Sequence, residues 1–63
     1  MKHIVESLKE RLKVIEERIN TLRKLIEAGK EVGIDVTSYE IRLKELEAQL
    51  GKWKKAVEKL EKT

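Results

Sequence analysis

The sequence predicts an all-α fold: a two-helix antiparallel hairpin of the coiled-coil type, which we expect to dimerise into a four-helix bundle. Three observations lead to this fold class. Apolar residues recur at alternating spacings of three and four along both halves of the chain. A helix stop followed by a helix start separates the halves, and proline, which breaks helices, is absent from all 63 residues. We therefore expect a single domain over residues 1–63.

The first helix is expected over about residues 2–32. Its apolar stripe has the heptad spacing of a coiled-coil seam and consists of Met1, Val5, Leu8, Leu12, Ile15, Ile19, Leu22 and Ile26. Gly29 lies in the continuation of the stripe, but a glycine inside a helix costs only about 1 kcal/mol relative to alanine. The pattern continues to Val32, so we extend the helix to that residue.

The turn, residues 33–37, combines a stop signal with a start signal. Gly33 can close the first helix in the left-handed conformation without a steric penalty from Cβ, and Ile34 can add the apolar contact that accompanies such a cap. Thr37 is expected to begin the second helix in a capping box, in which its hydroxyl accepts the Glu40 amide and the Glu40 carboxylate accepts the Thr37 amide. The residues at the staple positions on either side are Val36 and Ile41.

The second helix is expected over about residues 38–62. Its stripe repeats the same spacing through Tyr39, Leu43, Leu46, Leu50, Trp53, Val57 and Leu60. Because the stripe passes through Trp53 and Tyr39, we interpret both aromatic residues as parts of the core, with the Tyr39 hydroxyl at its rim. Only a few residues connect the helices, so the two stripes must meet as antiparallel neighbours.

Charge selects the register of the two helices. In one alignment four pairs of opposite sign flank the seam: Lys30 with Glu40, Arg23 with Glu47, Glu16 with Lys54, and Lys9 with Glu61. Sliding one helix by a heptad instead opposes Glu16 to Glu47 and Lys9 to Lys54. Each exposed pair contributes only about 0–1 kcal/mol, so the charges select a register rather than stabilise the fold. In the selected register, residues 1–8 extend past the end of the second helix.

The first helix carries a second stripe beside the seam, and its residues are mostly apolar or small. Such a face is wider than one partner helix can cover, and one core in a chain of this length rarely supplies more than about 3–5 kcal/mol. We therefore predict a homodimer with an interface made by Ile4, Arg11, Val14, Arg18, Leu25, Ala28 and Val32. The two arginines can extend across the contact or pair with acids of the second chain.

Composition argues against catalysis. The chain has one histidine, His3, no cysteine and no glycine-rich loop, so no catalytic, cofactor-binding or metal-binding set is visible. We expect no enzyme and no cofactor. No apolar run approaches the roughly 18 residues of a membrane span, and we expect a cytoplasmic protein without a membrane partner. Charged residues at 43% suit a thermostable, thermophile-like protein or a de novo designed one, and the sequence does not separate these origins.

Two other functions stay open. The net charge is +3, and the second helix carries a basic strip of Lys52, Lys55, Lys59 and Lys62, which makes nucleic acid an alternative partner. Such a dimer of hairpins is similar in architecture to Rop-like plasmid regulators, which bind RNA, and the similarity is one of architecture alone. The remaining alternative is a heteromeric complex, in which the first helix docks into a groove of another helical protein.

Overall fold

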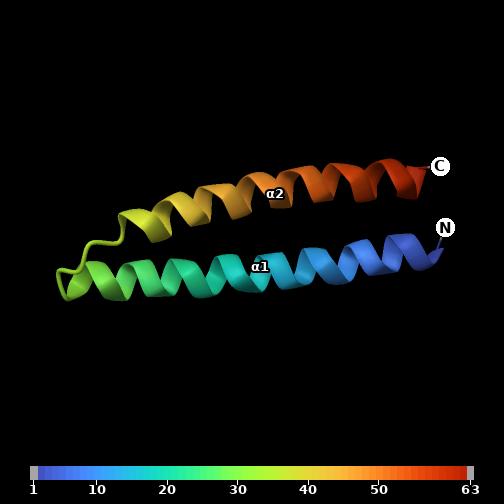
Figure 1. Ribbon diagram of the computed structural model, residues 1–63. Coiled ribbons are helices and arrows are strands. Elements are labelled where there is room, and N and C mark those ends of the chain that lie inside the picture. The colour runs from blue at the N-terminus through green and yellow to red at the C-terminus, as the bar shows by residue number, and fades with distance from the viewer. Residues whose placement is uncertain (1, 63) are drawn as a thin grey trace.

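The computed structural model describes residues 2–62, which form two α-helices and the turn between them (Figure 1). Helix α1 spans Lys2–Glu31 and helix α2 spans Thr37–Lys62. The helices pack side by side in opposite directions, forming a rod of 49 × 15 × 12 Å with both chain ends at one end. The helical hairpin predicted from the sequence is confirmed. Its helix bounds differ from the predicted ones by one residue on each side of the turn.

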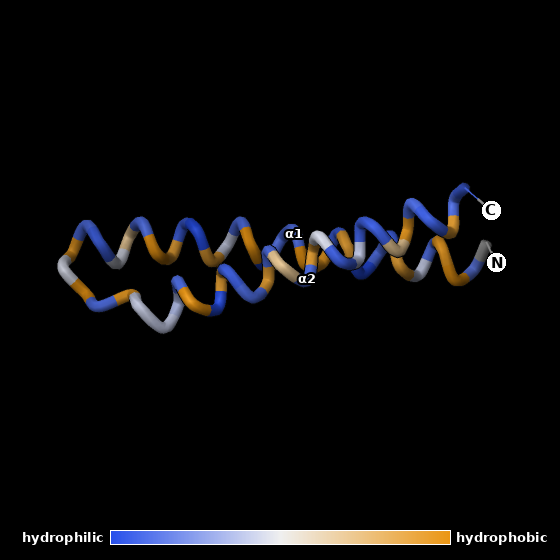
Figure 2. Tube along the Cα trace, turned by 90° about the horizontal axis from the view of Figure 1, so that it is seen from above, coloured by the Kyte–Doolittle hydropathy of each residue, from blue (hydrophilic) through white to orange (hydrophobic). Residues whose placement is uncertain are grey.

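The core is a row of side chains between the two helices. Its buried members are Ile15, Ile19, Ile26, Val36, Leu46 and Val57. All except Val36 belong to the predicted stripes, and Figure 2 shows hydrophobic residues recurring along both helices. Trp53 packs partly buried against the core with Leu22, Leu43 and Leu50, so its predicted place in the core is confirmed. Met1, predicted to continue the stripe, lies outside the described residues.

Tyr39 does not fill the core, because its side chain is 42% exposed. The prediction of a buried aromatic residue near the turn was wrong. In the register of the hairpin, the position opposite Tyr39 falls at Gly33, which follows the end of α1 and has no side chain on which the ring could pack.

Three of the four predicted ion pairs join the helices, which confirms the register. The distances are 3.0 Å from Lys9 Nζ to Glu61 Oε2, 2.8 Å from Arg23 Nη2 to Glu47 Oε2, and 3.4 Å from Lys30 Nζ to Glu40 Oε2. These three pairs occur near both ends and the middle of the rod. All six side chains are about half exposed, so each pair is worth at most about 1 kcal/mol.

The expected extension of residues 1–8 beyond the second helix does not hold for Leu8. This side chain is half-buried, and it lines a shallow groove together with Trp53 and Ala56 of α2. The reason is visible in Figure 1, where the described end of α1 lies beside the end of α2. Residue 8 therefore has a neighbouring helix to pack against.

The C-terminus of α1 is closed by a Schellman motif. Gly33 has a φ of 79°, as predicted, and its amide donates to the Lys30 carbonyl at 3.2 Å. The Ile34 amide donates to the Gly29 carbonyl at 2.9 Å. These two bonds satisfy carbonyls that a helix end otherwise leaves without partners. Ile34, expected to add an apolar contact to this cap, is 60% exposed.

The N-terminus of α2 is capped by Asp35, and the predicted capping box was wrong. Asp35 Oδ1 accepts the Thr37 amide at 3.0 Å and the Thr37 hydroxyl at 2.6 Å. The Glu40 amide donates to the Val36 carbonyl at 2.9 Å, as in the first turn of a helix. The Glu40 carboxylate pairs with Lys30 instead of reaching back to Thr37. The expected staple is also absent, since Val36 is buried and Ile41 is exposed.

Val36 instead packs against the backbone of α1 at Gly29. A Cβ atom built on Gly29 would lie 2.5 Å from Val36 Cγ1, closer than two carbon atoms can approach. Because Gly29 has no side chain, Val36 can occupy this space just before the start of α2. A glycine that looked like an irregularity in the heptad pattern is needed where the turn folds back.

Candidate association surface

The two sides of the seam differ in composition. We call the side with the three interhelical ion pairs, Lys9–Glu61, Arg23–Glu47 and Lys30–Glu40, the ion-paired flank. We call the other side the apolar flank, and it consists of Ile4, Arg11, Val14, Arg18, Leu25 and Ala28 of α1 together with Val32, which directly follows the end of α1. These are the residues that the sequence predicted for an interface, and all of them are exposed.

The large apolar side chains of this flank lie at the surface of the hairpin. Leu25 is 43% exposed and Val32 is 72% exposed, and Ile4 and Val14 lie between these values. Ile4, Val14 and Leu25 lie along one side of the 30-residue helix α1, and Val32 follows its end. They therefore form a long stripe rather than isolated surface residues. Burying a side chain of this size gains about 1.5–3 kcal/mol relative to leaving it in water.

A shallow groove runs along the apolar flank between the helices. Val14, Leu22 and Leu25 line it from α1, and Leu46 and Arg42 line it from α2. From the sequence, Leu22 and Leu46 were expected to lie in the seam alone. Geometry explains why these two residues also line the groove. In a pair of helices a seam residue is covered on two sides only, so the outer edge of its side chain stays accessible to a third helix.

A second apolar groove continues this surface toward the chain ends. It is lined by Leu8 of α1 and by Lys52, Trp53 and Ala56 of α2. The indole of Trp53 is therefore both packed on the core and open to this groove.

The arginines on this side are of two kinds. Arg42 Nη1 lies 3.5 Å from Glu45 Oε2 on its own helix. No ion pair of the described residues includes Arg11 or Arg18. Their guanidinium groups can move across an apolar contact while their aliphatic parts pack on it.

The total surface supports the same description of an open structure. A compact monomeric protein of 7.4 kDa has an accessible surface of about 4,200 Å², whereas this chain has 5344 Å². The difference of about 1,100 Å² exceeds the roughly 800 Å² that each partner buries in an interface of standard size. Among residues 3–62, no side chain is less than 2% exposed, so the core of the single hairpin is open at its edges.

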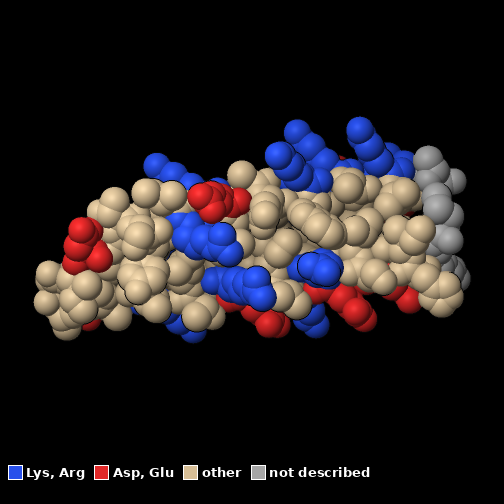
Figure 3. Space-filling view, in the orientation of Figure 1, with Lys and Arg blue, Asp and Glu red and all other residues tan. Residues whose placement is uncertain are grey.

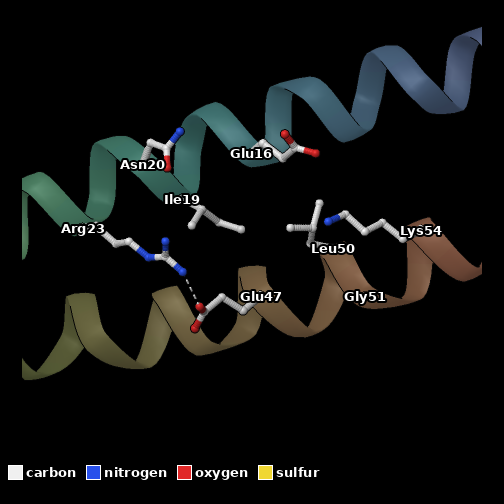
Figure 4. Close-up of a pocket in the computed structure, with 8 residues that line it drawn as sticks. All are labelled: Glu16, Ile19, Asn20, Arg23, Glu47, Leu50, Gly51 and Lys54. Atoms are coloured by element: carbon white, nitrogen blue, oxygen red, sulfur yellow. Dashed lines mark hydrogen bonds and ion pairs between the residues drawn. The ribbon is translucent and has the colours of Figure 1, made fainter.

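The ion-paired flank is more polar and its groove is lined differently. Figure 4 shows Arg23 bonded to Glu47, with Ile19 and Leu50 between the helices and Asn20 and Gly51 beside them. Glu16 and Lys54 lie farther along this groove, and the fourth predicted ion pair is not formed between them. Gly51 contributes no side chain here, so the groove stays open at this level.

The lysines proposed as nucleic-acid contacts are gathered on α2. Lys52, Lys55, Lys59 and Lys62 are all exposed, and none of them is in an ion pair with another described residue. Figure 3 shows basic side chains grouped on α2 toward the chain ends, with few acidic ones among them.

The described residues contain no group of three or more His, Cys, Asp or Glu side chains placed to hold a metal ion. Neither helix, within residues 2–62, is apolar enough over a sufficient length to cross a membrane. The hydroxyl and amide of Thr37 hold the pKa of Asp35 below its usual value of 3.8. This carboxylate caps α2, and its shifted pKa has a structural cause.

Comparison of the chain with protein-family models, with curated proteins and with solved structures finds no match.

Proposed function

We propose that this chain is a self-associating helical module, which forms a homodimer through the apolar flank of α1 and so completes a four-helix bundle. The observation that carries the proposal is the row of exposed apolar side chains on α1, which includes Val14 and Leu25 and continues to Val32 just after the helix. Covering them with a second hairpin removes from water the surface that the single hairpin leaves open. The surplus of about 1,100 Å² is enough for such an interface.

A second copy suits this surface because the flank combines large and small residues. In a twofold dimer the same patch must fit itself, so its large side chains need small ones at matching positions. Leu25, Val14 and the arginines are interspersed with Ser7, Thr21 and Ala28. Another helical protein of matching shape is the alternative occupant, and the experiment below distinguishes the two.

The first test is the molar mass of the wild-type chain in solution by sedimentation equilibrium, over chain concentrations from one to several hundred micromolar. We expect twice the 7.4 kDa of the single chain at the upper concentrations. A mass of 7.4 kDa throughout, with full helicity, would reject self-association and leave the heteromeric complex as the remaining use of this surface.

The second test introduces a charge on the apolar flank. Leu25→Glu is expected to weaken the dimer at least about 30-fold, since an unpaired buried carboxylate costs 2 kcal/mol or more at an interface. Ile41→Glu is the matched control, because Ile41 is 56% exposed on α2 and lines neither groove of the apolar flank. An equal loss of dimer in both variants would mean that the contact lies elsewhere or that the charge acts through the fold.

Nucleic-acid binding is a second candidate function, favoured by the four exposed lysines of α2 that have no acidic partner among the described residues. If all four contacted phosphates, the affinity for duplex RNA or DNA would fall about 100-fold between 50 and 200 mM salt. A gel-shift titration at the two salt concentrations tests this, with Lys52→Gln/Lys59→Gln as the variant. Binding that is absent at 50 mM salt, or unchanged in the variant, would exclude it.

A further inference from the structure

We infer that the two copies of α1 meet in antiparallel orientation in one register, with the twofold axis between Arg18 and Thr21. This inference rests on the proposed function and specifies its geometry. It follows from the order of residues on the apolar flank, from their exposure and from the register observed within the hairpin.

The apolar flank has the spacing of a second coiled-coil seam. Together with Ser7 and Thr21, which lie between them in the same row, its residues give the series Ile4, Ser7, Arg11, Val14, Arg18, Thr21, Leu25, Ala28 and Val32, with alternating steps of three and four. The same spacing builds the seam between α1 and α2, where the heptad positions of the two helices pair in antiparallel layers. A second antiparallel seam can therefore form by the same rules on the other side of α1.

Parallel pairing is disfavoured by charge. It would place each Arg11 beside the second copy's Arg11, and each Arg18 beside the second copy's Arg18. Neither residue has an acidic partner in an ion pair within the described chain. Two guanidinium groups brought together in a partly buried contact repel each other.

One antiparallel register matches apolar residues with each other and places each arginine opposite a small residue. It places Val14 against the second copy's Leu25, and Arg18 against the second copy's Thr21. It also places Arg11 against the second copy's Ala28. Each arginine then lies opposite a small residue, which leaves room for its aliphatic part to cross the contact and for its guanidinium to reach water.

The neighbouring registers are poorer. Sliding one copy by a heptad in one direction places Val14 against Arg18 and Leu25 against Ser7, so both apolar residues lose their apolar neighbours. Sliding it in the other direction leaves residues 2–13 beyond the contact and brings the two Lys24 side chains together at its outer edge. In the inferred register Lys24 instead faces the second copy's Glu17, while Glu10 faces the second copy's Glu31 near the ends of the contact.

The experiment is disulfide trapping with single cysteines, which is clean because the chain has none. V14C is mixed in turn with R18C, L25C and V32C in a glutathione redox buffer, and the mixed disulfide is quantified. These three partners report the three antiparallel registers, and V14C alone reports parallel pairing. Adjacent registers differ by about 10 Å along the helix axis, whereas a disulfide needs Cα atoms within about 7 Å.

We expect the V14C–L25C disulfide to exceed each of the other three products by about tenfold or more, because only this pair falls within bridging distance. Predominance of V14C–R18C or V14C–V32C would overturn the register, and predominance of the V14C homodisulfide would overturn the antiparallel orientation. Both results would leave the proposed function standing. A wild-type chain that sediments as a monomer would reject the proposed function itself.

A second measurement determines the distance between the two copies of residue 7 and requires no substitution of an apolar residue of the flank. Nitroxide labels on S7C are expected to lie roughly 37 Å apart along the helix axis in the inferred dimer, and about 10 Å nearer or farther in the two neighbouring registers. In a parallel dimer the two labels would lie at the same level on neighbouring helices, and therefore within about 20 Å of each other. Pulsed dipolar spectroscopy of frozen samples measures this distance, and any value other than the first overturns the inference.

Discussion

The ion-paired flank and the apolar flank border the same seam, but only the first has side chains that pair across it. On the ion-paired flank Lys9, Arg23 and Lys30 each find an acid on α2. On the apolar flank Val14 and Leu25 face an open groove. The difference shows how one short chain can divide two tasks. Charges on one side select how the chain folds on itself, and we propose that the other side serves association.

The largest effect is expected in the seam that both flanks border. Ile19 is 4% exposed, and Ile19→Ala should lower the free energy of unfolding by about 2–3 kcal/mol, at the lower end of the usual range because the surrounding core is open. Ile41→Ala removes the same atoms from an exposed position on α2 and should cost less than about 0.5 kcal/mol. Urea unfolding followed by circular dichroism measures both. Equal losses would mean that the seam is not the core.

The two glycines inside the helices should respond with opposite signs. Gly29→Ala places a methyl group 2.5 Å from Val36 Cγ1, and the resulting overpacking should outweigh the gain in helix propensity, for a net loss of about 1 kcal/mol. Gly51→Ala meets no atom within 4 Å on the ion-paired side and should gain about 0.5–1 kcal/mol. Thermal melts of the two variants compare them directly.

The control for the Gly29 prediction is a double variant. Adding Val36→Ala to Gly29→Ala reopens the space at the turn, so the two substitutions together should cost less than the sum of their separate effects. Additive costs, or a stabilising Gly29→Ala, would contradict the close approach of Val36 to α1.

A smaller effect is expected on the ion-paired flank. A double-mutant cycle with Arg23→Ala and Glu47→Ala should give a coupling energy of about 0.2–1 kcal/mol, falling as salt is raised, because both side chains are about half exposed. The molar mass in solution should stay that of the wild type, since these residues lie away from the apolar flank. A change of mass in either single variant would show that the two flanks do not act separately.

The smallest effect concerns acid. Hydrogen bonds from Thr37 lower the pKa of Asp35 below 3.8 in the folded state, so its contribution to stability is complete above that pH and is lost as the pH falls through the lowered pKa. Melting temperatures at pH 6 and pH 2 should therefore differ less in Asp35→Asn than in the wild type. The two proteins differ only at residue 35, so the difference between them isolates Asp35.

Periodicity and charge were enough to predict the hairpin and its register. Both signals are repeated along the helices, so a single exception such as Glu16 with Lys54 does not change the result. The N-terminal cap of α2 was missed for a physical reason, because the sequence assigned the Glu40 carboxylate to Thr37 and to Lys30 at once. One carboxylate cannot lie in both places, and it pairs with Lys30.

The space at Gly29 could not be predicted, because it depends on the path of the turn. Only when the Schellman motif at Gly33 sends the chain back does Val36 reach the backbone of α1. The apolar flank was predicted residue by residue on α1, where the second stripe is plain. The groove that Leu8 and Trp53 line was not predicted, because residue 8 was expected to extend past the second helix. In the structure the ends of the two helices are level rather than staggered.

The position of both chain ends at one end of the rod also has a consequence for the proposed dimer. With the two copies of α1 antiparallel, the ends of one copy point away from those of the other. Any proteins fused to them would be carried at opposite tips, separated by at least the 49 Å length of a single rod. The hairpin would then act as a rigid spacer with a fixed direction for each cargo.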